Sequence, residues 1–535
     1  MTQLTLSSQP VATHKVDALV LPVVPGDPAA TLSAALTLPR ETATHLAGLL
    51  SALGASGKAD EVHVVAMVPG LAATKVVLAG IAPKTGKDQS PTADSVRMGV
   101  GAALRTLGKA ESVAVAMPAE FLDAAAQGAL LGSYRFTVHK GAGTEDASAQ
   151  PASGRRAKRA TTSSPLTQNA SAQNALAQTS QTYAESITMV VPGAKAKDAK
   201  ATLTRAQVVA GATAYARDLV NTPPNLLFPQ SFVESVQGRV AAGRGDIEVV
   251  VHDEAKLAEL GCGGILGVGQ GSSRPPRIVE LHYRPRRAKS RIAFVGKGIT
   301  FDTGGVCIKP AASMLTMKSD MAGAAAAAAA VLAAAELELP TAVSAYLCLA
   351  ENMPGGNAQR PGDIVTMRNG TTVEIIDTDA EGRMVLADGM VLAAESGADA
   401  IVDIATLTGA CMVALGTRVA GLMGNDDALR ERIIGAARTT GEALWPLPLP
   451  EDLRAKLDSA VADLQHKGDQ YGGALTAGLF LREFARDGEG NPLPWAHLDI
   501  AGPSFTDAPT GHLLKGGTGY AVPTLIELAS SWSPA

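Results

Sequence analysis

Apolar runs of strand length alternate with longer helical stretches along most of this chain, and this alternation restricts the possible fold more than any other feature. In the first part, the pattern predicts strands at 17–22, 61–67, 75–78 and 112–116, and helices at 30–53 and 92–107. Strands that alternate with helices favour a mostly parallel sheet covered by helices. The sequence therefore predicts an α/β fold.

The later part repeats the pattern, with strands predicted at 247–251, 277–283, 291–295, 341–350 and 400–404. Asn369-Gly370 predicts a hairpin between 364–367 and 371–376, because both residues tolerate positive φ. The seven alanines of 324–330 predict a tightly packed, buried helix, since alanine combines high helix propensity with small volume.

The composition changes abruptly between Gly141 and about Thr182, where Ser, Ala, Gln, Thr and Gly dominate around a basic cluster at 155–159. Such a stretch cannot bury a core and predicts a disordered insertion. A strand at 187–191 resumes the first domain, and a helix at 198–220 leads onward. We predict two domains, each a mixed, mostly parallel sheet flanked by helices: an N-terminal domain over 1–195 and a linker helix with the larger C-terminal domain over 196–535.

Composition excludes several classes of protein. The 535 residues are 46% hydrophobic and 18% charged, which is typical of a globular chain with two or three domains. A net charge of −5 gives no global reason to bind nucleic acid or an anionic membrane. Residues 1–20 lack a secretory signal pattern, and the apolar stretch 321–335 is too short to span a bilayer. The four cysteines show no C-x-x-C spacing and fit a reduced, cytoplasmic setting: Cys262, Cys307, Cys348 and Cys411.

An acidic segment, 377–383, places three carboxylates and Arg383 within seven positions, between an apolar strand and an apolar helix. Carboxylates crowded at the end of a strand repel one another unless a cation or protons relieve them. Upstream, four more charged residues lie within or beside glycine-rich loops: Lys297, Asp302, Lys309 and Asp320. Together these residues predict a carboxylate-lined, two-metal hydrolytic site.

Simpler interpretations exist for the parts of this set. The acidic segment alone is equally typical of a solvated turn whose acids favour a helix N-terminus. Asp320 alone is equally typical of an N-cap for the alanine-rich helix. Other chemistries lack support, because the chain contains neither G-x-S-x-G nor H-E-x-x-H, and Gly296-Lys297-Gly298 lacks the spacing of a phosphate-binding loop. Cys307 has no histidine nearby in sequence, which favours a buried thiol over a nucleophile.

A series of motifs, in order along the chain, resembles one known family. The motifs are V-G-K-G-I-T-F-D-T-G-G at 295–305, Lys309, 317–321, 351–354, T-D-A-E-G-R at 378–383, 405–410, 495–502 and 515–520. This pattern closely resembles the leucyl aminopeptidase family, the cytosol aminopeptidases, in a bacterial form. The resemblance covers nearly all of 205–535, which it identifies as the catalytic domain, whereas 1–195 resembles that family's variable N-terminal domain only in outline.

The resemblance implies two divalent ions per subunit, of which manganese and zinc are favoured. One ion would be held by Asp302, Asp379 and Glu381, and the other by Lys297, Asp302, Asp320 and Glu381, so that two carboxylates bridge. Bridging carboxylates offset the repulsion of cations about 3.5–4 Å apart. A lysine ligand must be neutral, so the pKa of Lys297 would have to be lowered by a neighbouring dication.

The resemblance also implies catalytic roles. Lys309 would polarise the scissile carbonyl group and stabilise the oxyanion. Arg383 would hold a bicarbonate ion that acts as general base. Peptides would be the substrates, with leucine and other apolar N-terminal residues preferred, and the protein would be a cytoplasmic homohexamer. Four residues are implied to contact the substrate: Met317, Thr406, Leu407 and Gly409.

Two alternatives and one departure complete the predictions. A two-metal enzyme of another class, such as a phosphoesterase, is disfavoured by Lys297 as a metal ligand and by the paucity of arginines that could grip a phosphate. An additional DNA-binding role would rest on the 155–159 cluster alone, which a solvated loop explains better. The family has asparagine where this chain has Asp377. We expect Asp377 to lie behind the metal ligands and to orient one of them or Lys309. Two alternatives are that its side chain faces away from the site, or that it lies beside Asp379 and Glu381 and stays protonated until the pH rises.

Overall fold

The computed structural model describes residues 2–27, 29–33, 36–108, 110–139, 181–182, 184–192 and 196–533. The predicted insertion at 141–182, including its basic cluster, lies outside the described residues except for its last two positions. Within the described ranges, no helix combines the length and the apolar character that crossing a bilayer requires.

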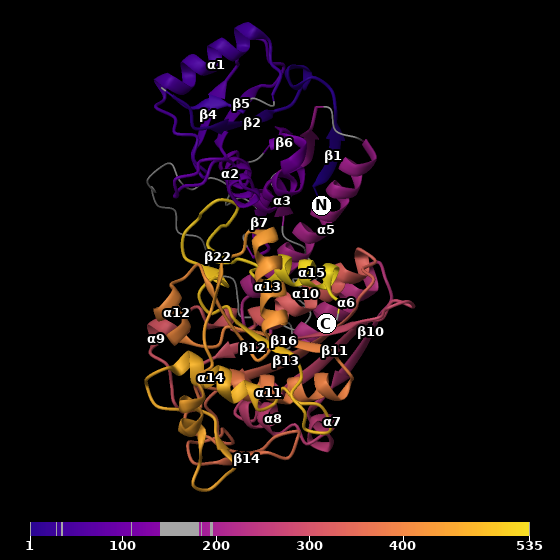
Figure 1. The fold of residues 1–535 in the computed structure, drawn as a ribbon, viewed down its shortest axis with the longest axis vertical. Coiled ribbons are helices and arrows are strands. Elements are labelled where there is room, and N and C mark those ends of the chain that lie inside the picture. The colour runs from indigo at the N-terminus through magenta and orange to yellow at the C-terminus, as the bar shows by residue number, and fades with distance from the viewer. Residues whose placement is uncertain are drawn as a thin grey trace, which may run out of the picture.

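The N-terminal domain is built on one sheet, in the upper part of Figure 1. Its strand order is β1-β9-β6-β2-β5-β4, with β3 paired to β2. All neighbours are parallel except β4 with β5 and β3 with β2. The strands are β1 (Gln3–Ser7), β2 (Ala18–Val24), β3 (Thr31–Leu32), β4 (Val62–Ala66), β5 (Lys75–Gly80), β6 (Ala110–Ala116) and β9 (Ala184–Val190), and the helices are α1 (Arg40–Ala52), α2 (Ala93–Thr106) and α3 (Leu122–Ser133).

The C-terminal domain is built on an eight-stranded sheet of order β10-β11-β13-β12-β16-β20-β17-β18. Its centre is parallel, because β13, β12, β16 and β20 all run the same way. The strands are β10 (Ile247–His252), β11 (Arg277–Tyr283), β12 (Arg291–Asp302), β13 (Ala342–Asn352), β16 (Ala400–Ala405), β17 (Ala420–Gly424), β18 (Leu444–Pro446) and β20 (Trp495–Asp499). A small sheet joins β14 (Ile364–Thr366), β15 (Thr372–Glu374) and β19 (Leu464–Gln465), and short pairs form between β7 (Tyr134–Arg135) and β8 (Gln181–Thr182), and between β21 (Phe505–Thr506) and β22 (Gly516–Gly517).

Helices cover this larger sheet. They are α6 (Pro229–Ala242), α7 (Glu254–Glu259), α8 (Gly263–Gly269), α9 (Ala311–Met314), α10 (Ala322–Glu336), α11 (Gly382–Glu395), α12 (Gly409–Leu415), α13 (Asp427–Thr440), α14 (Gly473–Arg482) and α15 (Val522–Ser531). The long helix α5 (Ala196–Asn221) lies at the junction of the two domains and packs against both α3 and α10 (Figure 1). These features confirm the α/β class with two domains. The boundary at 195/196 stays a prediction.

The alanine-rich helix is buried, as predicted. Every residue of Ala324–Ala330 lies in the core, where α10 packs on β12 and β13. The packing is close enough to require glycine on the strand, because a Cβ at Gly296 would lie 2.4 Å from Ala324 Cα. Small residues on both elements therefore place the helix directly against the strand that carries Lys297.

Two predictions of extent were wrong. The predicted helix 30–53 is instead the short strand β3 followed later by α1, which begins only at Arg40. Pro39 precedes that start in an extended conformation (ψ 141°), and a proline inside a helix would remove a hydrogen bond and clash with the preceding turn. The predicted strand 291–295 continues to Asp302. Lys297 and Asp302 therefore belong to β12 rather than to a glycine-rich loop.

The hairpin prediction is confirmed. β14 and β15 pair antiparallel, with Ile364 opposite Glu374. Gly370 in the turn has a φ of 86°, a conformation that favours glycine.

Candidate metal centre

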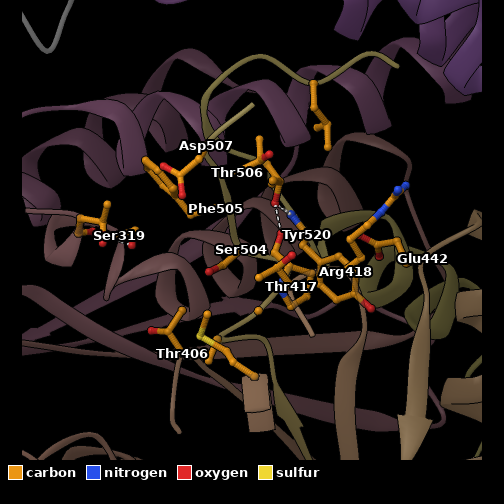
Figure 2. Close-up of a pocket in the computed structure, with 18 of the residues that line it drawn as sticks. Ser319, Thr406, Thr417, Arg418, Glu442, Ser504, Phe505, Thr506, Asp507 and Tyr520 are labelled. Carbon is orange, nitrogen blue, oxygen red and sulfur yellow. Dashed lines mark hydrogen bonds between the residues drawn. The ribbon is translucent and has the colours of Figure 1, made fainter. Parts of the chain in front are cut away.

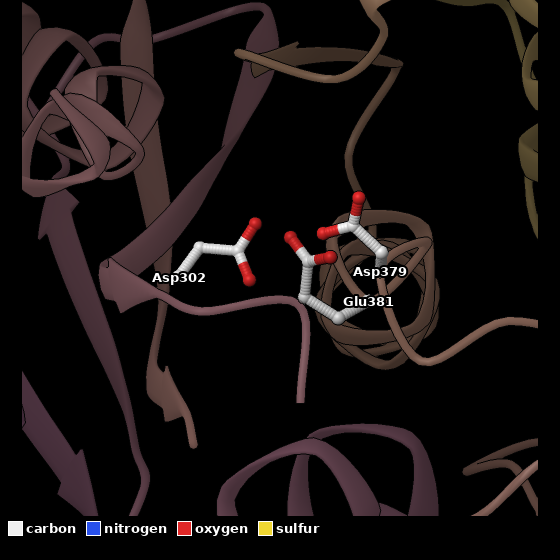
Figure 3. A group of neighbouring side chains, drawn as sticks. All are labelled: Asp302, Asp379 and Glu381. Carbon is white, nitrogen blue, oxygen red and sulfur yellow. The ribbon is translucent and has the colours of Figure 1, made fainter. Parts of the chain in front are cut away.

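The charged residues predicted from the sequence converge at the carboxyl end of β12, which is where ligands bind in open parallel sheets. Lys297 and Asp302 come from β12, Asp320 directly precedes α10, and Asp379 and Glu381 directly precede α11. Ligand atoms of Asp302, Asp379 and Glu381 all lie within 4.8 Å of one another. Figure 3 shows the three carboxylates turned toward a common point.

Lys297 is buried within the cluster. Its Nζ is 2.9 Å from Asp320 Oδ2 and 2.7 Å from Glu381 Oε1, and it donates to the carbonyl oxygen of Thr406 at 3.0 Å. Burial disfavours the charged amine, but the charges of Asp320 and Glu381 outweigh burial and raise the pKa of Lys297. The carboxylates alone thus keep Lys297 protonated, and the neutral amine of a metal ligand depends on the charge of the ion itself.

Lys309 approaches the same cluster from its open side. Its Nζ lies 2.8 Å from Asp302 Oδ2 and 2.5 Å from Asp379 Oδ1. Burial opposes the charge on this amine, yet Asp302 and Glu381 raise its pKa. Lys309 is therefore a cation that can donate hydrogen bonds into the site.

The protein's own groups fit a bound cation. Four carboxylates and two ammonium groups leave an excess of negative charge in a buried place. Burial raises the pKa of both Asp320 and Glu381, and Lys297 offsets only part of that rise. Asp320 Oδ2 and Glu381 Oε1 are buried, and the donor beside both of them is the Lys297 ammonium. Carboxylate oxygens crowded around one amine are oxygen ligands of the kind that a divalent ion prefers, and its charge would take the place of the ammonium proton.

Asp302 is oriented by a residue whose role the sequence did not reveal. Asn352 Nδ2 donates to Asp302 Oδ1 at 2.9 Å and to the carbonyl oxygen of Thr378 at 2.9 Å, and the backbone N–H of Gly304 donates to Asp302 Oδ1 at 2.8 Å. Asn352 ends β13 and stands opposite Asp302 in the register of the two parallel strands. The sequence does contain a signal for Asn352, because it is a polar residue just after the strand predicted at 341–350.

The cluster opens into a cavity of about 990 Å³. Its lining includes the four residues implied to contact substrate, Met317, Thr406, Leu407 and Gly409, together with the cluster's own Lys297, Asp302, Lys309, Asp320, Asp379 and Glu381. Figure 2 shows Thr406 and Ser319 on one side of this cavity, with Ser504 and Phe505 beside them. Thr406 Oγ1 donates to Asp320 Oδ1 at 2.6 Å, so Asp320 is held by the site. The N-cap of α10 is Met321, which excludes the N-cap interpretation of Asp320.

Comparison with known proteins identifies the family that has these sequence features. The family model described as "Cytosol aminopeptidase family, catalytic domain" matches residues 214–526, and "Cytosol aminopeptidase family, N-terminal domain" matches 20–142. The chain belongs to the cytosol aminopeptidase family. It is therefore a peptidase, as its resemblance implied.

Individual relatives agree with this family membership. The chain is 46% identical to a "Probable cytosol aminopeptidase" of Streptomyces coelicolor over 99% of this chain and 98% of the relative, and 46% identical to one of Micrococcus luteus over 92% and 91%. Among solved structures, bottromycin maturation enzyme BotP in complex with Mn matches with a TM-score of 0.78 and 33% identity, covering 96% and 99% of the two chains. A mutant of tomato leucine aminopeptidase matches with a TM-score of 0.80 and 29% identity, covering 99% and 96%.

Arg383, the last residue of the acidic segment 377–383, is not part of the cavity lining. It lies in the first turn of α11, is buried, and donates from Nη1 to the carbonyl oxygen of His466 at 2.7 Å. Burial lowers the pKa of Arg383 to about 10. Its Nε is buried without a hydrogen-bond partner among the described residues. The bicarbonate role of Arg383 stays a prediction.

Asp377, the departure from the family pattern, lies behind the cluster. Its Oδ1 accepts the backbone N–H of Asp379 at 3.0 Å, and its Oδ2 pairs with Lys467. Burial raises the pKa of Asp377, but Lys467 and the Asp379 N–H more than offset this effect and lower it. Asp377 is thus ionised rather than protonated, and its contacts are to Asp379 and Lys467 rather than to Lys309.

Asp499 is a second residue that the sequence did not single out. It ends β20, is fully buried, and accepts three hydrogen bonds: from Leu407 N–H at 3.2 Å, from Thr408 Oγ1 at 2.7 Å and from Ala501 N–H at 3.1 Å. One carboxylate therefore holds two cavity-lining loops together. It lies in the motif at 495–502, and a buried acid that ends a predicted strand was the available signal.

Proposed function

We propose that this protein is a two-metal aminopeptidase that releases apolar N-terminal residues, leucine foremost, from peptides. The observation that carries the proposal is the convergence of Asp302, Asp379 and Glu381 within 4.8 Å in a site with excess negative charge. BotP, a structural relative, was solved in complex with Mn, which supports manganese as the divalent ion, and zinc is the second candidate.

The ligands divide between two positions. Asp302, Asp379 and Glu381 would hold one ion, and Lys297, Asp302, Asp320 and Glu381 the other, so that Asp302 and Glu381 are shared. Divalent ions bound there would polarise the scissile carbonyl group and lower the pKa of a shared water.

The protein's own groups then orient the peptide and stabilise developing charge. The Lys309 ammonium, already within hydrogen-bond distance of Asp302 and Asp379, would donate to the oxyanion of the tetrahedral intermediate. Backbone groups of Leu407 and Gly409 would position the peptide chain along the cavity. Met317 and Thr406 would surround its first side chain.

Arg383 would hold a bicarbonate ion, which in this role accepts a proton from the attacking water. The buried Nε without a partner supports an oxyanion beside this guanidinium. For the whole protein, the family resemblance supports a cytoplasmic homohexamer with a domain boundary at 195/196.

The decisive experiment measures release of leucine and the free aniline from a leucyl anilide. The wild-type protein should lose activity on treatment with a chelator and regain it on addition of Mn²⁺ or Zn²⁺. Asp302→Asn should abolish both the activity and stoichiometric metal binding, because this carboxylate is shared. Asp458→Asn, at an exposed ion pair with Arg454, is the matched control and should leave both unchanged. Chelator-resistant hydrolysis, or an active Asp302→Asn variant, would refute the two-metal assignment.

A further inference from the structure

The cavity continues well beyond the proposed metal centre. At about 990 Å³ it is at the upper end of the range for small-ligand sites, and larger than one N-terminal residue requires. Figure 2 shows Ser319 and Thr406 on one side, Arg418 and Glu442 on the other, and Ser504–Asp507 between them. The lining beyond Arg418 includes Asp94 and Arg97 of α2, so this end lies where the two domains meet.

Arg97 is a buried cation with few partners. The residue is 6% exposed, and its Nη1 lies 3.6 Å from Asp94 Oδ1, beyond hydrogen-bond distance. Its Nε is buried with no hydrogen-bond partner among the described residues. A guanidinium carries five N–H donors, and leaving them unpaired in a buried place is unfavourable. Arg97 therefore points to an acceptor that would enter the cavity.

Arg418 adds a second positive charge at the same end. It is exposed, lines the cavity, and forms no hydrogen bond or ion pair with the residues that the structure describes. Burial raises the pKa of Asp94, and the charges of Arg97 and Arg418 offset part of that rise, so both guanidiniums act on one carboxylate.

The other acid at this end is already engaged. Glu442 accepts hydrogen bonds from Ala521 N–H at 2.8 Å, from Thr524 N–H at 3.1 Å and from Thr524 Oγ1 at 2.5 Å. These donors lie at the start of α15, where the helix dipole also favours a negative charge. Glu442 is thus held by α15 and uses none of the N–H donors of Arg97 or Arg418. One end of the cavity carries excess negative charge, and the other carries two guanidiniums that form no hydrogen bond among the described residues.

The spacing of the two ends suits a short peptide. The helix α12 runs between them, since Gly409 and Met412 line the cavity near its start, and Thr417 and Arg418 line it just beyond its end. Its seven residues span about 10 Å at ~1.5 Å per residue. An extended peptide covers such a distance in about three residues, at roughly 3.4 Å each. When the reach of an arginine side chain is added, peptides of about three to five residues fit the distance between the two ends of the cavity.

We propose that Arg97 and Arg418 form a binding site for the C-terminal carboxylate of a short peptide whose N-terminus lies at the metal centre. This inference rests on the proposed aminopeptidase function and deepens it. The enzyme would favour free tri- to pentapeptides over dipeptides and over peptides with a blocked C-terminus. Such oligopeptides are what an endopeptidase releases from larger chains.

The test compares tetrapeptide Leu-Ala-Ala-Ala with its C-terminal amide, and dipeptide Leu-Ala with its amide. In the wild-type protein, amidation should raise KM for the tetrapeptide by roughly threefold to tenfold. Amidation removes the carboxylate charge, and the loss of its hydrogen bonds to the two arginines should cost more than the loss of an exposed ion pair and less than the loss of a buried charged hydrogen bond. Amidation of the dipeptide should leave KM unchanged, because its C-terminus does not reach Arg418. In Arg418→Gln the tetrapeptide acid and amide should have equal KM.

Arg418 is exposed, so its substitution should not impair folding, and Arg97→Gln serves as the second variant. Arg286→Gln, at an exposed arginine outside the cavity lining, is the matched control and should behave like the wild type. Leucyl anilide turnover should stay within twofold in Arg418→Gln. A wild-type KM indifferent to amidation, or slowed anilide turnover in Arg418→Gln, would overturn the carboxylate site. A wild-type protein that does not hydrolyse leucyl anilide would instead remove the proposed function and this inference with it.

Discussion

The two lysines of the centre differ in what surrounds each amine. Lys297 Nζ contacts two carboxylates and a backbone carbonyl oxygen and is buried, whereas Lys309 Nζ contacts two carboxylates at the mouth of the cluster. The carbonyl oxygen of Thr406 and the two carboxylates together hold the Lys297 amine within the cluster. Lys309 is the cation placed to reach an incoming peptide.

Replacement of Lys309 by alanine should therefore lower kcat by roughly 10²–10³-fold, the range for loss of one oxyanion donor. KM should change little, because the interaction strengthens only in the transition state. Steady-state kinetics with leucyl anilide measure both constants. Lys256→Ala, at an exposed lysine paired with Glu259, is the control. A change confined to KM would contradict the proposed role of Lys309.

Asp377→Asn should retain activity while weakening metal binding, because the substitution removes a negative charge two residues before Asp379 and breaks the pair with Lys467. The lowered pKa of Asp377 means that its stabilising contribution is present above the ordinary carboxyl pKa and is lost as the pH falls through the lowered value. The wild type should thus exceed the variant in stability at neutral pH by less than about 1 kcal/mol, and the two should converge in acid.

Metal titration and thermal unfolding at several pH values measure these effects of Asp377→Asn. Lys467→Ala should reproduce the stability change, since it removes the same pair from the other side. If metal affinity and the acidic limb of the pH–rate profile both match the wild type, Asp377 has no part in the site.

At the scale of secondary-structure elements, the contact between β12 and α10 positions the centre. The strand carries Lys297 and Asp302, the loop before the helix carries Asp320, and glycine and alanine let the two backbones approach closely. The distance between elements thus sets the distance between ligands. The register of β12 with β13 likewise places Asn352 beside Asp302.

Gly296→Ala should destabilise the protein by about 1–3 kcal/mol or more, because its Cβ would meet the backbone of Ala324 at 2.4 Å and the helix would have to shift. Gly211→Ala in α5 is the matched control, since no atom lies within 4 Å of the added Cβ and alanine is the better helix former. The control should leave stability unchanged or raise it by up to ~1 kcal/mol. Thermal unfolding of both variants checks the prediction. If Gly296→Ala were as stable as the wild type, α10 would be able to shift away from the strand without loss of stability.

At the scale of the whole molecule, charge is distributed unequally along one cavity that both domains line. The carboxylate cluster lies at one end and the Arg97–Arg418 pair at the other, with the N-terminal domain contributing Arg97 through α2. This arrangement gives the N-terminal domain a direct part in substrate recognition.

Metal removal should therefore lower the thermal stability of the whole protein. A ligand that binds only the folded state stabilises it by mass action, so chelation should lower Tm, and restoring Mn²⁺ should reverse the change. Glu381→Gln should show a much smaller chelator effect, because it removes a shared ligand. Differential scanning calorimetry compares the two proteins. An identical decrease of Tm in both would place the bound metal elsewhere.

Part of this protein could be predicted from residues close together in the chain. The alternation of strand and helix patterns determined the α/β class, the alanine run determined a buried helix, and the ordered motifs determined the family and predicted five ligand residues. Periodicity and turn chemistry are local properties, and for that reason the sequence expresses them directly. Helix extent at 30–53 was wrong because Pro39 outweighs the surrounding apolar pattern.

Tertiary structure alone decided which groups lie beside those ligands. Asn352 reaches Asp302 across a strand pair, Asp499 accepts a hydrogen bond from Leu407, 92 residues away in the chain, and Arg97 and Arg418 line one cavity from different domains. Burial and electrostatic neighbours arise from packing between distant segments, so a local sequence pattern does not predict them. The sequence by itself determined the fold class and predicted the ligand residues, whereas the packing of two domains around one cavity decided how those residues are held and which other residues line the cavity.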